Sequence, residues 1–408
     1  MGWPKYSIQS LSEIFTDGDW IESKHQSSSG IRLIQTGNIG EGVFKDRQDK
    51  ARYISKETFT KLKCFEVIPR DCLISRLPDP VGRACLIPKI NGRAITSVDC
   101  TVVRFQLDKI EPRFFQYYSM SREYLQKVNS LTSGATRKRI SRKNLGQVEI
   151  PLPELSEQKR IVAILDEAFA DIDKARALTE QNLKNARELF ESYLQQVFGE
   201  RGSEWKSSLL KNITSKIGSG ATPRGGKDAY KTEGLSLIRS LNVYDRAFKT
   251  KGLARIDSEQ AERLKNVMLE KGDVLLNITG ASVARCCMVP DEVLPARVNQ
   301  HVSIIRVNAQ ELLPDFLMFG LTSSVYKEQL LGIGEAGSTR QAITKSQIEN
   351  FLFWYPNDIS KQHDTVTKIE NIKHQSDEMI KLYELKVKSL NNLKISVLQK
   401  AFSGQLTT

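Results

Sequence analysis

Two short loops of this 408-residue chain combine a glycine with a hydroxyl and a guanidinium group: Gly134 to Arg137 (GATR) and Gly337 to Arg340 (GSTR). Glycine lets the backbone approach a ligand closely, and threonine can donate a hydrogen bond to phosphate. Arginine can bind phosphate or the edge of guanine through two hydrogen bonds. One such loop is more readily explained as a solvated turn. Two of them, each upstream of a long helix, favour nucleic-acid binding or docking of a domain onto a helix.

Further basic and hydroxyl residues surround these loops. The first continues into the most basic stretch of the chain, residues 130–145, and residues 218–227 (GSGATPRGGK) form a glycine-rich loop. This loop is not expected to bind ATP, because a P-loop requires glycine and serine or threonine where the chain has Ala221 and Asp228. A plain mobile loop explains it equally well. The candidate DNA-binding residues are Thr136, Arg137, Lys138, Arg139, Arg142, Thr222, Arg224, Lys227, Thr339 and Arg340.

The sequence offers little for catalysis. It contains no G-x-G-x-x-G, H-E-x-x-H or G-x-S-x-G motif, and no amino-methyltransferase or nuclease motif. None of its six cysteines forms a C-x-x-C pair, so we expect reduced thiols in a cytosolic protein, with neither a metal site nor disulfides. No apolar run is long enough to span a membrane. We therefore interpret the chain as a binding protein with no catalytic residues.

Two long helices are predicted to position the candidate loops. Residues 156–199 and 360–404 contain no proline, and no glycine before their last residue. Each begins with Ser-x-Gln and ends with Leu-Gln-x-x-Phe, at a constant offset of 204 residues. Apolar residues at alternating steps of four and three predict the seam of a coiled coil. The expected interface residues are Ile161, Leu165, Ala168, Ile172, Asn182, Leu189, Ile369, Ile372, Ser376, Met379, Leu390 and Leu393.

The segments between the helices repeat as well. The predicted strand around Leu33 corresponds to the predicted strand around Leu237. Helices are predicted at equivalent places, over 112–128 and 314–326. The chain is thus predicted to be a tandem duplication of an α+β module, a globular domain followed by a long helix. The expected domains are 1–155, 156–199, 200–359 and 360–408. If the helices pair antiparallel, Asn182 falls near Ser376 and could form a polar layer that fixes the register.

The charge distribution favours a polyanionic partner for the globular parts. The net charge is +12, and residues 1–155 contribute 25 Lys or Arg against 17 Asp or Glu. The first long helix carries 6 cationic and 8 acidic residues. It is therefore expected to be a spacer or docking surface and not a DNA-binding arm.

These features together resemble the specificity subunit of type I restriction-modification systems. The resemblance rests on residues 151–161 (PLPELSEQKRI), their partner at 355–362 (YPNDISKQ), the two helix endings, the G-x-T-R loops and the Gly-Ala-Thr-Pro at 220–223. It covers the whole chain, although Trp354-Tyr355-Pro356 replaces the usual Pro-Leu-Pro in the second copy.

The resemblance implies two α/β target recognition domains that read the halves of a bipartite double-stranded DNA sequence, with the paired helices as a ruler between them. It also implies two modification subunits, which bind S-adenosylmethionine and methylate adenine, and two restriction subunits, which use ATP and Mg. This chain itself would be a non-catalytic subunit without cofactors, in the cytoplasm of a bacterium or archaeon. A coiled-coil scaffold or adaptor for protein partners, with incidental basic charge, is the alternative. A DNA enzyme with an unrecognised site ranks third.

Overall fold

The computed structural model describes residues 2–134, 137–223, 225–335 and 341–406. The chain divides into two compact units, residues 1–179 with 385–408, and residues 180–384. Each unit contains one globular part and portions of the two long helices α5 (Leu155–Gly199) and α11 (Ile359–Phe402). The four-domain subdivision of the sequence stays a prediction. No helix in the described ranges has the length and apolar composition needed to cross a bilayer.

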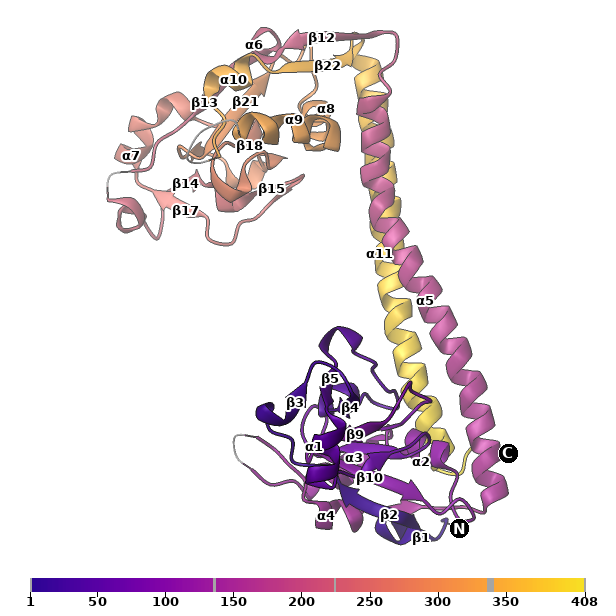
Figure 1. The fold of residues 1–408 in the computed structure, drawn as a ribbon. Coiled ribbons are helices and arrows are strands. Elements are labelled where there is room, and N and C mark those ends of the chain that lie inside the picture. Colours follow the sequence, from indigo (N-terminus) through magenta and orange to yellow (C-terminus); the bar gives the residue numbers. More distant parts are fainter. Residues whose placement is uncertain (1, 135–136, 224, 336–340, 407–408) are drawn as a thin grey trace. The chain divides into compact units, whose positions relative to one another are not determined.

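The first unit contains two main sheets (Figure 1). One has the strand order β2-β10-β7-β8, and the other has the order β3-β5-β4-β9-β6, in which β4 and β9 are parallel. The elements are β1 (Lys5–Ser7), β2 (Ser12–Asp17), β3 (Gln26–Ser27), β4 (Ile31–Ile34), β5 (Arg52–Ile54), α1 (Lys56–Leu62), β6 (Glu66–Val67), β7 (Cys72–Ser75), β8 (Ala84–Leu86), β9 (Ala94–Thr96), β10 (Cys100–Phe105), α2 (Pro112–Tyr118), α3 (Arg122–Ser130), α4 (Arg142–Gly146) and β11 (Glu149–Pro151).

The second unit repeats this topology. Its main sheets have the orders β13-β21-β18-β19 and β17-β14-β20, and β14 and β20 are again parallel. The elements are β12 (Trp205–Leu209), α6 (Leu210–Ile213), β13 (Thr214–Ser219), β14 (Leu235–Ile238), β15 (Val243–Tyr244), β16 (Ala247–Phe248), β17 (Ala254–Ile256), α7 (Ser258–Arg263), β18 (Val274–Asn277), β19 (Cys286–Met288), β20 (Ala296–Val298), β21 (Val302–Val307), α8 (Pro314–Thr322), α9 (Ser324–Glu335), α10 (Lys345–Glu349) and β22 (Leu352–Pro356).

The duplication extends to buried polar contacts. Asp71 accepts two hydrogen bonds of 2.8 Å from Arg104, and Asp273 accepts bonds of 2.7 and 2.8 Å from Arg306. Both carboxylates are almost completely buried. Buried charge is tolerated only when it is paired and hydrogen-bonded, so these arginines are required by the fold and are not free for a ligand.

The predicted single helices over 112–128 and 314–326 are each broken into two. Ser121 caps α3 by accepting a hydrogen bond from the backbone N–H of Tyr124, while the fully buried Ser323 lies between α8 and α9. A serine that bonds to the backbone competes with helix continuation. That competition is the physical reason for the break at Ser121.

The long helices begin and end within two residues of their predicted limits and pack antiparallel, which confirms the predicted fold class. In the first unit, Lys394 of α11 contacts Asp173 of α5 at 2.9 Å. In the second unit, Arg187 of α5 contacts Glu384 of α11 at 2.9 Å. Figure 1 shows the two helices running side by side.

The buried face of the helix pair differs in part from the predicted seam. Ile161, Leu165, Ile172, Ile369 and Ser376 are buried, and Ala168, Asn182, Ile372, Met379 and Leu390 are half-buried. Leu189 and Leu393 are 40% and 48% exposed, whereas Phe190 and Leu398 belong to the hydrophobic cores of the two units. Ser376 donates its hydrogen bond to the backbone carbonyl of Ala186 at 2.5 Å, one turn away from the expected Asn182.

A buried glutamine attaches the start of each helix to the globular part before it. Gln158 accepts a hydrogen bond from the N–H of Glu111 and donates to the carbonyls of Lys109 and Pro153. Gln362 makes the same three bonds, with Leu313, Glu311 and Pro356. The Ser-x-Gln repeat therefore marks two equivalent anchoring points.

The end of each helix packs into the globular part of the other repeat. The ring centroid of Phe198 in α5 lies 5.2 Å from that of Phe316 in the second unit. The ring centroid of Phe402 in α11 lies 5.3 Å from that of Phe114 in the first unit. Leu194 and Leu398, one turn earlier, are buried beside them. The Leu-Gln-x-x-Phe repeat is thus a pair of equivalent core contacts.

Candidate nucleic-acid interface

Three segments converge at the same place in each unit. They are a 3₁₀ turn after the strand β4 or β14, the loop of the hairpin β7–β8 or β18–β19, and the segment that follows the G-x-T-R loop. In the first unit, Ile140 donates its backbone N–H to Arg76. In the second, Ile343 donates to Ile278 and Gly280 to Gln341. The two predicted loops therefore lead into equivalent surface positions.

Different side chains hold the turn to the hairpin in the two units. In the first, buried Arg83 donates hydrogen bonds to the carbonyls of Thr36, Ile39, Leu77 and Pro80. In the second, Asn277 donates to the carbonyl of Ser240 and the hydroxyl of Ser282. A shared backbone arrangement is thus held by different buried side chains in the two units.

The cations after the first G-x-T-R loop lie at the edge of this region. Arg137 and Lys138 line a hollow of about 780 Å³ that Ile395 of α11 also lines. Arg139 is half-exposed and pairs with Asp99 at 3.0 Å, and exposed Arg142 begins α4. These four residues are available to phosphate, although Arg139 is partly neutralised by its partner.

A buried arginine, Arg76, lies beneath this loop. Arg76 pairs with Asp17 at 3.2 Å and donates to the carbonyl of Val98. Burial lowers the pKa of the Arg76 guanidinium, the Asp17 carboxylate opposes this shift, and the cations of Arg139 and Arg142 add to it. Because Asp17 pairs with Arg76, the net positive charge at this loop comes from the exposed cations that follow it.

The other predicted DNA-binding residues lie on the glycine-rich loop of the second unit or in the G-x-T-R loops themselves. The backbone N–H of Thr222 donates to Gln300 at 2.8 Å, and Lys227 lies in a short 3₁₀ helix, Gly226–Ala229. Thr136, Arg224, Thr339 and Arg340 lie outside the described residues. All ten DNA-binding assignments stay predictions.

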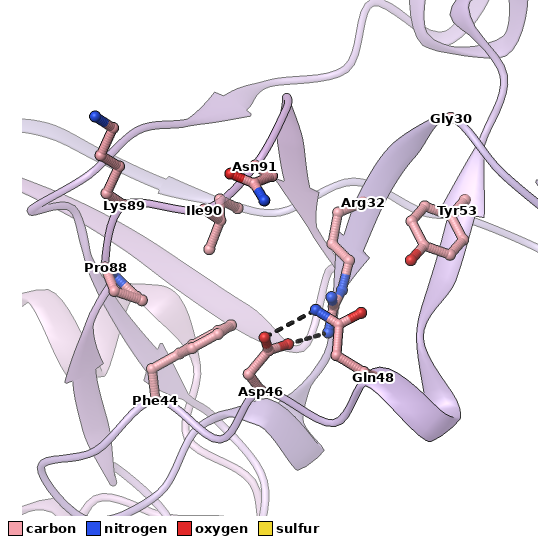
Figure 2. A pocket seen from close by; sticks show the side chains of 10 residues that line it. All are labelled: Gly30, Arg32, Phe44, Asp46, Gln48, Tyr53, Pro88, Lys89, Ile90 and Asn91. Atoms are coloured by element: carbon pink, nitrogen blue, oxygen red, sulfur yellow. Dashed lines mark hydrogen bonds and ion pairs between the residues drawn. The ribbon is translucent and has the colours of Figure 1, made fainter.

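Three polar hollows were not predicted from the sequence, and two of them lie beside the 3₁₀ turns. Two of them, of about 400 and 460 Å³, lie along residues 44–53 of the first unit. The smaller is shown in Figure 2, with Arg32, Asp46 and Gln48 joined by hydrogen bonds. The signal available in the sequence was Arg32, a lone charge inside the apolar strand Ile31–Ile34.

The third hollow belongs to the second unit. It has a volume of about 460 Å³ and is lined by Ser240, Tyr244, Arg285 and His301, among others. The ring Nδ1 of His301 lies 2.6 Å from the hydroxyl of Thr279. Side chains with hydroxyl and guanidinium groups can form hydrogen bonds with the edges of bases. Within the described ranges, no group of three or more His, Cys, Asp or Glu could hold a metal ion.

Comparison with known proteins identifies the family. Residues 1–183 match the type I restriction modification DNA specificity domain. The chain is 27% identical to the type I restriction enzyme EcoBI specificity subunit of Escherichia coli, over 99% of this chain and 86% of that protein. These comparisons support the assignment of this chain as a type I restriction-modification specificity subunit.

Solved structures show the same fold. A chain from a study of complex assembly and conformational transition of a type I restriction-modification system superposes with a TM-score of 0.73 at 19% identity, covering 99% of this chain and 98% of that one. The HsdS subunit of Thermoanaerobacter tengcongensis superposes with a TM-score of 0.63 at 18% identity, covering 99% and 97%. As a specificity subunit the chain is non-catalytic, and the family predicted from the sequence is confirmed.

Proposed function

We propose that this specificity subunit reads a bipartite double-stranded DNA target, one half with each globular part. The observation that carries the proposal is the repeated convergence of turn, hairpin and G-x-T-R segment. Different side chains line the hollows there: Arg137 and Lys138 beside the hairpin loop of the first unit, and Tyr244, Arg285 and His301 in the second. Equivalent surfaces with unlike donors and acceptors would read unlike half-sites. The exposed cations after the first loop would bind phosphate and position the protein.

The paired helices α5 and α11 would set the unspecified gap between the half-sites. A helix of 45 residues is about 67 Å long at 1.5 Å per residue. The buried glutamines and the terminal phenylalanines attach the helices to the globular parts at both ends. Such attachment would make the length of the helices a determinant of the gap.

The helices would also dock the catalytic partners. In the first unit, Leu178, Leu385 and Ile395 are about 60% exposed on α5 and α11. Burial of these side chains against another protein would be favourable, because their apolar surface would leave water. The partners would be two modification subunits, which bring S-adenosylmethionine, and two restriction subunits, which use ATP and Mg.

The test is DNA binding by the chain co-expressed with its modification subunits. Genomic fragments would be selected by repeated pull-down at two salt concentrations and sequenced. We expect one two-part motif with a fixed gap. Recovery of no motif, with affinity only at low salt, would contradict sequence reading and leave a basic scaffold.

A further inference from the structure

Arg32 occupies an unusual position for a charged residue. It lies in β4 between Ile31 and Leu33, whose side chains are buried together with Ile54 and Ile95. Side chains alternate along a strand, so Arg32 points to the opposite face of the sheet. There it is only 9% exposed. A buried arginine needs a structural or functional partner for its five N–H donors.

The fold supplies only part of that partnership. The Arg32 Nη2 donates a hydrogen bond of 2.8 Å to one carboxylate oxygen of Asp46. The other oxygen of Asp46 accepts a hydrogen bond of 2.8 Å from the side-chain amide of Gln48. Among the described residues Arg32 has no other acceptor, and its Nε is buried without one. By contrast, all four carbonyls around Arg83 accept from that side chain. Asp46 thus fixes the Arg32 side chain, while other N–H groups of its guanidinium have no acceptor.

The space beside Arg32 suits a planar ligand. The hollow of about 400 Å³ has flat or apolar walls from Phe44, Tyr53 and Ile90, with Gln48 and Asn91 at its rim (Figure 2). Asp46 neutralises Arg32, which weakens attraction for a phosphate. It also fixes the guanidinium plane, which helps Arg32 to donate two parallel hydrogen bonds.

We propose that Arg32, held by Asp46, reads a guanine in the half-site bound by the first unit. Guanine presents the acceptors N7 and O6 in the major groove, and the Nη1 donors with the second Nη2 donor of Arg32 match that pair. The amide of Gln48 adds a donor and an acceptor for the same or the neighbouring base pair. This inference rests on the proposed function, because it assigns part of the recognition to one residue.

The second unit supports this assignment through the equivalent strand pair. Arg32 on β4 lies opposite Tyr53 on β5, and the corresponding pair on β14 and β17 is Ser236 opposite Arg255. The arginine has moved to the other strand of the same pair, where its Nη1 lies 3.2 Å from the Ser236 hydroxyl. A framework position would keep its residue, as Arg104 and Arg306 do. A recognition position would change between unlike half-sites.

The experiment compares target preference between variants of the complex with its modification subunits. Wild type, Arg32→Ala, Arg32→Lys and Gln48→Ala would be put through DNA selection with sequencing, followed by competition binding at fixed salt. Arg70→Ala is the matched control, since Arg70 is an exposed arginine of the same unit that lies outside the hollow. Thermal unfolding would verify that each variant folds.

Arg32→Ala is expected to reduce the preference for guanine at one position of one half-site by roughly tenfold or more. The other half-site would keep its sequence. Arg32→Lys would restore affinity in part but not the preference, and Gln48→Ala would weaken discrimination at the same or the adjacent position. Gln48 is exposed and serves as the informative variant if Arg32→Ala fails to fold.

Two outcomes would overturn the inference. One is an unchanged motif in both Arg32→Ala and Gln48→Ala. The other is an equal loss of affinity for every sequence, which would indicate a phosphate contact. Failure of the wild-type complex to select any motif would instead contradict the proposed function itself, so the two failures are distinguishable.

Discussion

At the scale of single residues, the two copies agree most closely where side chains bond to buried backbone. Asn38 and Asn242 each accept from the N–H three residues earlier and donate to the carbonyl seven residues later. The glutamine anchors follow the same rule. These residues satisfy backbone groups that no regular element can satisfy, so the fold constrains them tightly.

Replacing a glutamine anchor is expected to destabilise its unit. Gln158→Ala leaves two carbonyls and one N–H without their partner in the interior, at a cost of about 2 kcal/mol or more. Urea unfolding would measure the loss. Gln195→Ala, at an exposed position of the same helix, should change stability by less than about 0.5 kcal/mol. Equal effects of the two substitutions would contradict the anchoring role.

Gly220, in the Gly-Ala-Thr-Pro motif, is expected to tolerate no side chain. A Cβ there would collide with the carbonyl of Val298, and the equivalent Gly18 would collide with that of Thr96. Gly220→Ala should therefore cost about 1–3 kcal/mol in urea unfolding. The matched control is Gly218→Ala, since a Cβ at Gly218 meets nothing within 4 Å. A stable Gly220→Ala protein would show that the strands can separate at this point.

Residues whose pattern is local can be predicted from the sequence, whereas a site assembled from distant segments cannot. The repeated Ser-x-Gln and Leu-Gln-x-x-Phe motifs were visible because both copies keep them. The hollow around Arg32 was not, because it joins residues 32, 46, 48 and 91 from separate loops and strands. The spacing of residues in the sequence also does not show that Arg104 is paired with Asp71, whereas Arg32 has N–H donors without an acceptor.

At the scale of elements, the basic segment after the first G-x-T-R loop should control non-specific affinity. Replacing Arg137, Lys138, Arg139 and Arg142 together with alanine removes four cations. For each of them that binds a phosphate, the slope of log K against log salt should become shallower by roughly 0.9. The selected motif should stay the same. A change in the selected DNA motif would mean that this segment contacts bases. An unchanged slope of log K against log salt would mean that the segment does not contact the DNA.

A buried hydrogen bond within the second unit marks the register of the helix pair. Ser376 is buried against Ala186, and its hydroxyl bonds to the Ala186 carbonyl. Cysteines placed at 186 and 376 should therefore cross-link rapidly with a short reagent. Cysteines at 182 and 376, the pair expected from the seam, should react more slowly. The reverse order would indicate a register shifted by one turn.

At the scale of the whole molecule, the length of the helix pair should determine the gap between the two half-sites of the DNA motif. Deleting one heptad from both helices shortens each by about 10 Å, close to three base pairs. The selected gap should shorten by that amount, or binding should fail because the half-sites then face differently around the duplex. Deletion from α5 alone is the control, and it should abolish binding by breaking the pairing. An unchanged gap after the double deletion would exclude the ruler.

The second unit is one continuous stretch of chain, whereas the first is built from both ends of the molecule. Leu398, Ala401 and Phe402 belong to the same core as Phe114 and Tyr118. During synthesis on a ribosome, the unit that begins first is therefore the one that is completed last. Until the final turns of α11 emerge, the first unit has an open apolar surface that a chaperone can recognise. A message truncated near its end would yield a finished second unit and an unfinished first.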